Sequence, residues 1–190
     1  GGFFSYQDVI VSSSKFDKNR AGGYGGGFYI SDYITTVTDS VFTNNSASDG
    51  GGFYSRYSTS TVVNSVFTNN SANSGGGFRV QYLKASNIIV SSNNTGIFLN
   101  YGEEHVLYNS VFTDNNHSDI NGSTSVIIAN LNNNYIDLNN VGVNNFNSNN
   151  IFDGVNLGFV DEVNGDYNLT ASSDLIDTGT TTITGLTLPT

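Results

Sequence analysis

The sequence predicts an all-β fold, a right-handed parallel β-helix with about 22 to 25 residues in each coil. Three Gly-Gly-Gly-Phe motifs place Phe28, Phe53 and Phe78 at equal intervals, and Phe3 lies one further interval upstream. A second motif, Phe-x-x-Asn-x-Ala, lies between the glycine runs, at residues 16–21, 42–47 and 67–72. A fixed period of this length is typical of solenoid proteins, in which every repeat forms one coil.

Each repeat contains about three short runs rich in Val, Ile, Thr, Phe and Tyr, for example 28–30, 34–37 and 39–42. These residue types favour strands, and the Gly, Asn, Asp and Ser clusters between them favour turns. No window has a sustained helical period. We therefore expect parallel strands that stack from coil to coil with a rise of about 4.8 Å. Weaker copies at 89–93 and 111–116 indicate that the solenoid continues beyond residue 100.

Stacking places equivalent residues of successive coils above one another. One inward aromatic column is expected to contain Phe16, Phe42, Phe67 and Phe112, and a second Phe3, Phe28, Phe53, Phe78 and Phe98. Buried rings stabilise such a core through the apolar area that they bury and through ring contacts. Asparagine pairs should form side-chain amide ladders at one turn, at positions 44–45, 69–70, 93–94 and 115–116.

The whole chain, residues 1–190, is expected to form one solenoid of about seven to eight coils, roughly 35 Å long. Residues 1–125 form its regular coils, 126–158 form irregular, Asn-rich coils, and 159–190 form a terminal segment. No Pro-rich or Gly/Ser linker separates these parts. The chain begins in the middle of a repeat, which indicates a part of a longer chain.

The motifs Gly-Gly-Gly-Phe and Phe-Thr-Asn-Asn-Ser-Ala resemble the GGA(I/L/V) and FxxNxA repeats of polymorphic outer-membrane proteins and related right-handed parallel β-helix proteins. Phe here replaces the usual aliphatic residue after the glycines. In the tail, residues 159–161, 165–169 and 172–179 resemble the terminal string of choice-of-anchor Q surface proteins, with Asp174 in place of the usual Pro. The resemblance implies a secreted or surface-anchored prokaryotic protein, and it implies no particular reaction.

The amino-acid composition excludes several kinds of site and disfavours some partners. The absence of Cys excludes a disulfide framework, thiolate catalysis and Cys-ligated zinc. No signal peptide, membrane span or lipidation motif is visible, so no direct membrane insertion is expected from this chain. Residues 1–100 carry six Lys or Arg and five Asp or Glu, whereas residues 101–190 carry eleven acids and no Lys or Arg. This acidic balance disfavours nucleic acid as a partner.

No cofactor is expected apart from calcium, for which the acids near the C-terminal loops are weak ligand candidates. They are Asp153, Asp161, Glu162 and Asp166. These residues match no EF-hand and no glycine-aspartate calcium repeat, so the alternative is a solvated acidic surface.

Outward residues on the strands that follow the glycine runs form a candidate contact face for glycans or a partner chain. They are Tyr29, Tyr54, Arg56, Arg79, Gln81 and Tyr82. The alternative is that these side chains only support the sheet. Six Asn-x-Ser/Thr sequons also occur, at Asn44, Asn69, Asn93, Asn116, Asn121 and Asn168, which is about the number that this composition gives by chance.

Three functions stay open on the sequence alone. The first is an extracellular structural or adhesive protein that self-associates into a filament, sheath or surface layer. The second is a monomeric carbohydrate-binding adhesin. The third is a polysaccharide lyase or hydrolase whose site lies outside this chain. The expected columns bring no two acids onto adjacent coils, and His105 and His117 are isolated from other catalytic residue types, so an enzyme is disfavoured.

Overall fold

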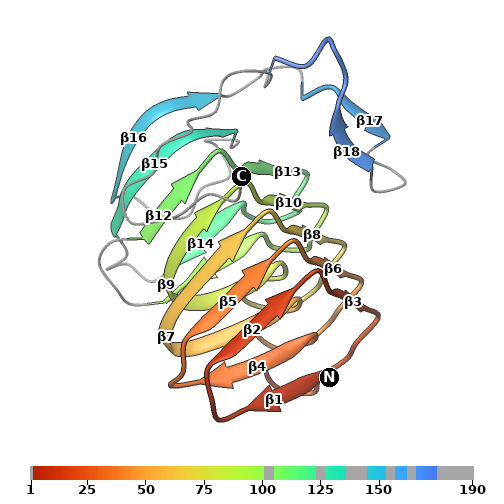
Figure 1. The fold of residues 1–190 in the computed structure, drawn as a ribbon, viewed down its shortest axis with the longest axis vertical. Helices are drawn as coiled ribbons and strands as arrows, with labels where there is room; N and C mark the ends of the chain where they lie inside the picture. Colours follow the sequence, from red (N-terminus) through yellow and green to blue (C-terminus); the bar gives the residue numbers. More distant parts are fainter. Residues whose placement is uncertain are drawn as a thin grey trace.

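The computed structural model describes residues 2–100, 105–122, 127–135, 145–152, 157–161 and 166–174. Across these segments the chain is all-β without a helix, and its parallel strands stack as a solenoid of about five turns (Figure 1). The predicted fold class is confirmed, with fewer turns than the seven to eight that the sequence suggested. One regular coil runs from Phe28 to its partner Phe53, and a later, shorter coil runs from Val90 to its partner Phe112.

Each of the first two coils contains three short strands. They are β1 (Phe3–Ser5), β2 (Val9–Ser12) and β3 (Lys15–Asp17), then β4 (Phe28–Ser31), β5 (Thr35–Thr38) and β6 (Val41–Thr43). In the third and fourth coils the first two strands merge into one that runs through the corner between them. These coils contain β7 (Phe53–Val63) and β8 (Val66–Thr68), then β9 (Phe78–Ser86) and β10 (Ile89–Ser91).

The remaining strands continue the stack and then leave it. They are β11 (Ile97–Leu99), β12 (His105–Tyr108), β13 (Val111–Thr113), β14 (Ile120–Gly122), β15 (Ile127–Tyr135), β16 (Asn145–Phe152), β17 (Phe159–Asp161) and β18 (Asp166–Leu169). β1 to β16 belong to one sixteen-stranded sheet of parallel pairs, whereas β17 and β18 form a separate antiparallel pair. Among the described residues there is no helix long and apolar enough to cross a membrane.

Two aromatic columns form the centre of the core, largely as the sequence predicts. Phe3, Phe28, Phe53 and Phe78 are aligned in register, as are Phe16, Phe42 and Phe67. Stacked neighbours lie 4.8 to 5.1 Å apart between ring centroids. Each buried ring contributes roughly 1.5 to 3 kcal/mol from its apolar area, with about 0.5 to 1.5 kcal/mol more for a well-placed aromatic pair.

The predicted columns are wrong at one position and incomplete at another. Ile97 pairs with Phe78, so Phe98 points outward and pairs with Arg79. The interval from Phe78 to Ile97 is shorter than the regular coil, because the corner in β9 and the loop between β10 and β11 both contain fewer residues than their counterparts. Val90 fills the place between Phe67 and Phe112 in the other column.

The asparagine ladder is present, with two of its four predicted pairs shifted by one residue. Asn45, Asn70, Asn93 and Asn115 are buried, and the side chain of each bonds the corresponding asparagine of a neighbouring coil. Asn19 joins the ladder at the first coil through the side chain of Asn45.

The residue before each ladder asparagine has a positive φ. These residues are Lys18, Asn44, Asn69, Ser92 and Asp114. The fourth coil therefore uses the pair 92–93 and the fifth coil the pair 114–115, and not the pairs 93–94 and 115–116 that the sequence suggested. Asn93 and Asn115 take the buried place, and Ser92 and Asp114 take the left-handed one.

The glycine runs are needed for two separate reasons. Gly50 has a φ of +64°, in the left-handed region that glycine adopts without a steric penalty. Gly51 lies so close to the next coil that a Cβ atom would stand 2.3 Å from the carbonyl oxygen of Gly76. The run therefore combines a turn conformation with close backbone stacking.

Candidate interaction surface

A strip of outward side chains follows the axis on the strands that begin each coil. The register aligns Phe4, Tyr29, Tyr54, Arg79 and Phe98 on β1, β4, β7, β9 and β11. Three of the six predicted contact residues thus lie in one column, which we call the outer strip.

Arg79 is held on every side by neighbours in or beside the outer strip. Its guanidinium carbon lies 5.1 Å from the ring centroid of Tyr54 and 4.7 Å from that of Phe98. Nη1 pairs with a carboxylate oxygen of Asp49 at 2.5 Å, and Nε and Nη2 donate to Asn100 Oδ1 at 3.0 and 2.8 Å. Arg79 therefore joins three coils, and its role in this geometry is structural.

The tyrosine rings of the outer strip pack against neighbouring aromatic rings. Tyr29 stacks on Phe4 at 5.1 Å and lies 5.5 Å from Tyr54, while Tyr24 packs against both tyrosines. Tyr54 is only 4% exposed, and this burial raises the pKa of its hydroxyl above the usual 10, against the opposing charge of Arg79. Since the ring faces are covered and Tyr54 is buried, only the half-buried Tyr29 offers a ring edge to a ligand.

The other three predicted contact residues lie around the corner where the first strand of each coil turns into the second. Arg56 is half-buried and follows Ser31 in register, with its guanidinium carbon 4.3 Å from the ring centroid of Tyr57. Gln81 is half-buried, and Tyr82 is 40% exposed and pairs with Thr59. The structure therefore divides the predicted face between the outer strip and this corner.

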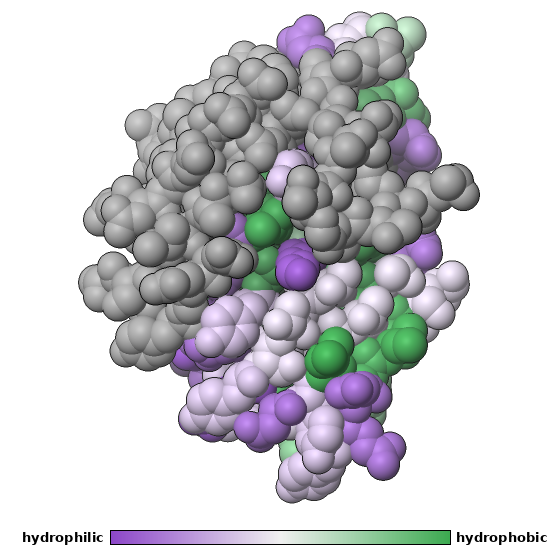
Figure 2. Space-filling view, turned by 60° about the vertical axis from the view of Figure 1, so that its left-hand side comes forward, coloured by the Kyte–Doolittle hydropathy of each residue, from purple (hydrophilic) through white to green (hydrophobic). Residues whose placement is uncertain are grey.

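The corner carries a cluster of exposed large side chains that the sequence reading missed. We define the apolar corner as Tyr6, Ile10, Tyr33, Ile34, Tyr57 and Tyr82, which are exposed by 38 to 78%. Figure 2 views this side of the molecule and shows pale and green groups in its lower part, with hydrophilic groups between them. Five of the six lie within or close to the corner segments, and Ile10 is an outward residue of β2.

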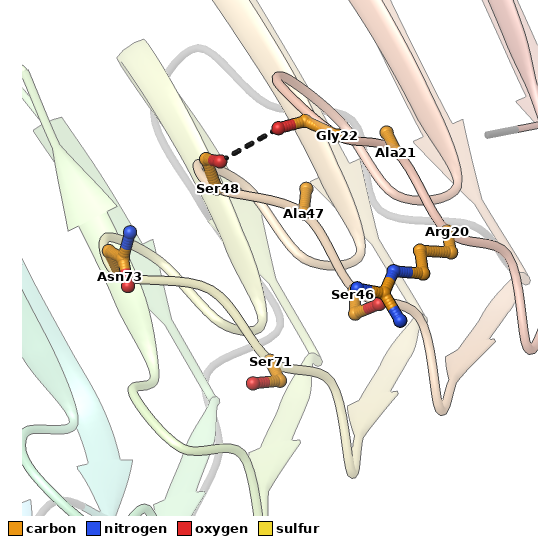
Figure 3. Close-up of a pocket in the computed structure, with 8 residues that line it drawn as sticks. All are labelled: Arg20, Ala21, Gly22, Ser46, Ala47, Ser48, Ser71 and Asn73. Atoms are coloured by element: carbon orange, nitrogen blue, oxygen red, sulfur yellow. Dashed lines mark hydrogen bonds between the residues drawn. The ribbon is translucent and has the colours of Figure 1, made fainter.

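A shallow groove crosses the loops that connect the asparagine ladder to the glycine runs (Figure 3). It has a volume of about 220 Å³ and is lined by Arg20, Ala21, Gly22, Ser46, Ala47, Ser48, Ser71 and Asn73. Ser48 Oγ donates to the carbonyl oxygen of Gly22 at 2.9 Å, and Arg20 extends over Ser46 at one end. The groove thus presents hydroxyl groups, small apolar side chains and one cation across three coils.

The predicted calcium residues are only partly described. Asp153 and Glu162 lie outside the described residues, while Asp161 and Asp166 face each other across the β17–β18 pair. One carboxylate oxygen of Asp166 accepts hydrogen bonds from the main chain and the side chain of Asn168. Within the described segments, no three His, Asp or Glu side chains are grouped so that they could hold a metal ion.

The sequons fall into different environments. Asn44, Asn69, Asn116 and Asn168 are exposed, and Asn121 is half-buried. Asn93 is fully buried in the ladder, where its side chain bonds Asn115 and the carbonyl oxygen of Phe67. A glycan on Asn93 is incompatible with this arrangement.

The two histidines have no catalytic surroundings in the part of the chain that the structure describes. His117 is exposed and its Nδ1 lies 2.8 Å from the carbonyl oxygen of Asn94. His105 is fully buried, and neither ring nitrogen has a hydrogen-bond partner among the described residues. Burial lowers the pKa of His105 from 6.5 to about 4, so the ring is neutral at pH 7.

Comparison with known proteins identifies no family for this chain. No protein-family model, no curated protein and no solved structure matches the chain.

Proposed function

We propose that this chain is a structural unit of an extracellular prokaryotic surface protein and that it self-associates along its sides into a larger assembly. The observation that carries the proposal is the apolar corner, six exposed aromatic or aliphatic side chains along one edge of a solenoid. Large exposed apolar side chains that gather in one region of a protein surface commonly mark interaction sites. The resemblance of the glycine and asparagine motifs to polymorphic outer-membrane repeats supports the surface location.

The interior of the solenoid supports a structural role. The stacked Phe rings and the asparagine ladder join each coil to the next through the described regular part of the chain. Because each coil contacts only its neighbours, the same contacts can extend a rod to any number of repeats. Such a rod presents one edge repeatedly along its length, which suits assembly better than turnover of a substrate.

Sedimentation velocity over a wide concentration range, with negative-stain electron microscopy of the same samples, tests the proposal. We expect reversible association, with the fraction of associated chains rising as the protein concentration rises, at low and at moderate salt. A parallel sample with a calcium chelator shows whether an ion takes part. A chain that sediments as a monomer up to about millimolar concentration, the weak end of specific binding, contradicts the proposal.

Removal of the apolar corner provides a specific control. The triple variant Ile34→Thr, Tyr57→Asn and Tyr82→Thr replaces three of the six side chains. Thr and Asn already occur in the strands and turns of this chain, so these replacements should be compatible with the fold. We expect it to fold and to lose association. The matched variant Tyr24→Ser with Val41→Thr changes side chains that are exposed by 46 and 37% outside the corner, and it should associate like the unaltered chain.

The groove supports a second candidate function, a carbohydrate-binding adhesin. Its hydroxyl groups and its cation at Arg20 suit a polar, extended ligand, and an acidic oligosaccharide would use the charge of Arg20. Calorimetric titration with neutral and uronate-containing oligosaccharides tests this candidate. Binding that is lost in Arg20→Ala and kept in Arg56→Ala supports it, and the absence of binding to the whole panel contradicts it.

A further inference from the structure

From the charges around the apolar corner we infer that two copies of this chain pair side by side in antiparallel orientation, so that the first coil of one copy faces the fourth coil of the other. The inference rests on the proposed self-association, because it specifies the partner and the orientation for that contact. It depends on how four charged residues are ordered along the corner.

The register places the corner residues of four successive coils along one line. Val9, Thr35, Ser60 and Leu83 are equivalent at the start of the second side of each coil. The segments just before them therefore stack, and they are 6–8, 31–34, 56–59 and 81–82. Hydrogen bonds link the first three of these segments, from the Ile34 N–H to Asp8 Oδ1 and from the Asp32 N–H to the carbonyl oxygen of Arg56, both at 2.9 Å.

The charges along this line are segregated by sign. Asp8 in the first coil and Asp32 in the second are exposed acids. Arg56 in the third coil is a half-buried base, and Lys84 in the fourth coil is an exposed base that lies just after the corner, in register with Thr61. No other Asp, Glu, Lys or Arg occurs in residues 6–10, 31–36, 56–61 or 81–84. From the first coil to the fourth, the corner therefore reads acid, acid, base, base.

Only one orientation satisfies all four charges when two such corners meet in full overlap. A parallel pair in register brings acid against acid and base against base. An antiparallel pair brings Asp8 opposite Lys84 and Asp32 opposite Arg56, and the twofold axis repeats both contacts. A two-fold interface must be self-complementary in this way. Opposite charges across an interface select the orientation and the association rate more than they add affinity.

The apolar side chains fit the same orientation. Tyr6 in the first coil would face Tyr82 in the fourth, and Ile34 in the second would face Tyr57 in the third. Four coils give a contact about 15 to 20 Å long. We expect this narrow contact to bury less than the 800 Å² or so on each partner that is typical of a stable interface. The dimer should therefore be weak, with a dissociation constant of tens of micromolar or more.

Charge variants test the pairing by sedimentation equilibrium at low salt. Arg56→Glu with Lys84→Glu makes the corner uniformly acidic, and Asp8→Lys with Asp32→Lys makes it uniformly basic. Each double variant replaces opposite charges by like charges at four contacts, so we expect a roughly tenfold weaker dimer. A mixture of the two double variants should associate, and the fourfold variant that carries all these changes should dimerise like the unaltered chain.

Controls separate charge pairing from net charge and from folding. Lys15→Glu with Lys18→Glu makes the same change in net charge on β3 and the turn that follows it, away from the corner, and should leave the dimer unchanged. Lys18 already adopts a φ of +57°, which indicates that Lys can replace Asp32, whose φ is +71°. If a Lys variant unfolds at lower temperature, Asp8→Asn with Asp32→Asn keeps a side-chain acceptor at position 8 and should remove most of the salt dependence.

Cysteine cross-linking determines the orientation, since the chain contains no natural Cys. Gln7→Cys in one copy and Gln81→Cys in a second copy of different mass should form a mixed disulfide. In the antiparallel pair the two Gln7 positions lie about three coils, roughly 14 Å, apart, which is too far for a disulfide. Rapid linkage of Gln7→Cys to itself would show parallel pairing and overturn the inference.

The outcomes distinguish this inference from the proposed function. A monomer at all concentrations overturns self-association and the antiparallel pair together. A dimer that keeps its affinity in both double charge variants, or that gives no mixed disulfide, overturns only the antiparallel pair.

Discussion

The side-chain oxygen of Asn70 accepts two hydrogen bonds from Asn45, one from the main-chain N–H at 2.9 Å and one from Nδ2 at 3.0 Å. The amide group of Asn70 in turn donates to the carbonyl oxygen of Phe42 at 2.9 Å and to Asn93 Oδ1 at 3.1 Å. One buried side chain thus satisfies main-chain and side-chain groups on the coils before and after it. This pattern is repeated along the ladder and fixes the turn in every regular coil.

Asn70→Ala should therefore be strongly destabilising. The substitution leaves the N–H of Asn45 and the carbonyl oxygen of Phe42 buried without these partners, at a cost of about 2 to 4 kcal/mol. For a chain of this length the loss corresponds to a fall in melting temperature of roughly 5 to 15 °C. Thermal unfolding followed by circular dichroism measures it. Asn69→Gly, at the exposed neighbour with a φ of +56°, is the control and should change little.

Gly51→Ala should also destabilise the chain, although it adds only a methyl group. The new Cβ atom would stand 2.3 Å from the carbonyl oxygen of Gly76 and 2.8 Å from the main chain of Ser71, so two coils must separate. We expect a loss of about 3 kcal/mol in denaturant unfolding. Gly23→Ala has no heavy atom within 4 Å of the added group and should be close to neutral. Equal stability of the two variants would contradict the close approach of the coils.

Phe67→Asp should prevent folding, because Phe67 is fully buried between the rings of Phe42, Phe53 and Phe78. An unpaired buried carboxylate costs several kcal/mol, in addition to the lost apolar contact. Phe67→Val copies the residue that Val90 supplies one coil later and should cost roughly 2 to 3 kcal/mol. Val41→Asp, on an outward position exposed by 37%, is the control. A Phe67→Asp chain with an unchanged melting temperature would show that the column does not face the core.

Stability should fall with acid because of His105. The folded pKa of about 4 lies below the unfolded value of 6.5, so the unfolded chain binds more protons between these two values. The contribution of neutral His105 is therefore complete above pH 6.5 and is lost as the pH falls towards 4, with a total of about 3 kcal/mol.

His105→Leu isolates this effect, since Leu83 is the residue at the preceding level of the stack by the register of β9 and β12. We expect the unaltered chain to lose about 3 kcal/mol more than the variant between pH 7 and pH 4, measured by denaturant unfolding at each pH. The carboxylates titrate in both chains, so their effect cancels in the comparison. Parallel stability curves for the two chains would contradict a buried, neutral ring.

The period of the sequence was enough to predict the fold and most of its core. The equal spacing of Phe28, Phe53 and Phe78 determines that they stack, because residues one period apart occupy the same place in successive coils. Alternation along a strand then determines which neighbours point outward, as it does for Tyr29 and Tyr54. These conclusions need only local geometry and repetition.

Tertiary structure decided the positions where the repeat length changes and where separate turns meet. Phe98 was assigned to the core because it follows a degenerate repeat, but only the packed structure shows how many residues the preceding coil omits, and one residue of slip reverses the side. Arg79 gained its partners Asp49 and Asn100 from two other coils, and no spacing in the sequence indicates that contact. The apolar corner likewise exists only once four turns are stacked, because its members are joined by register across coils and not by any local motif.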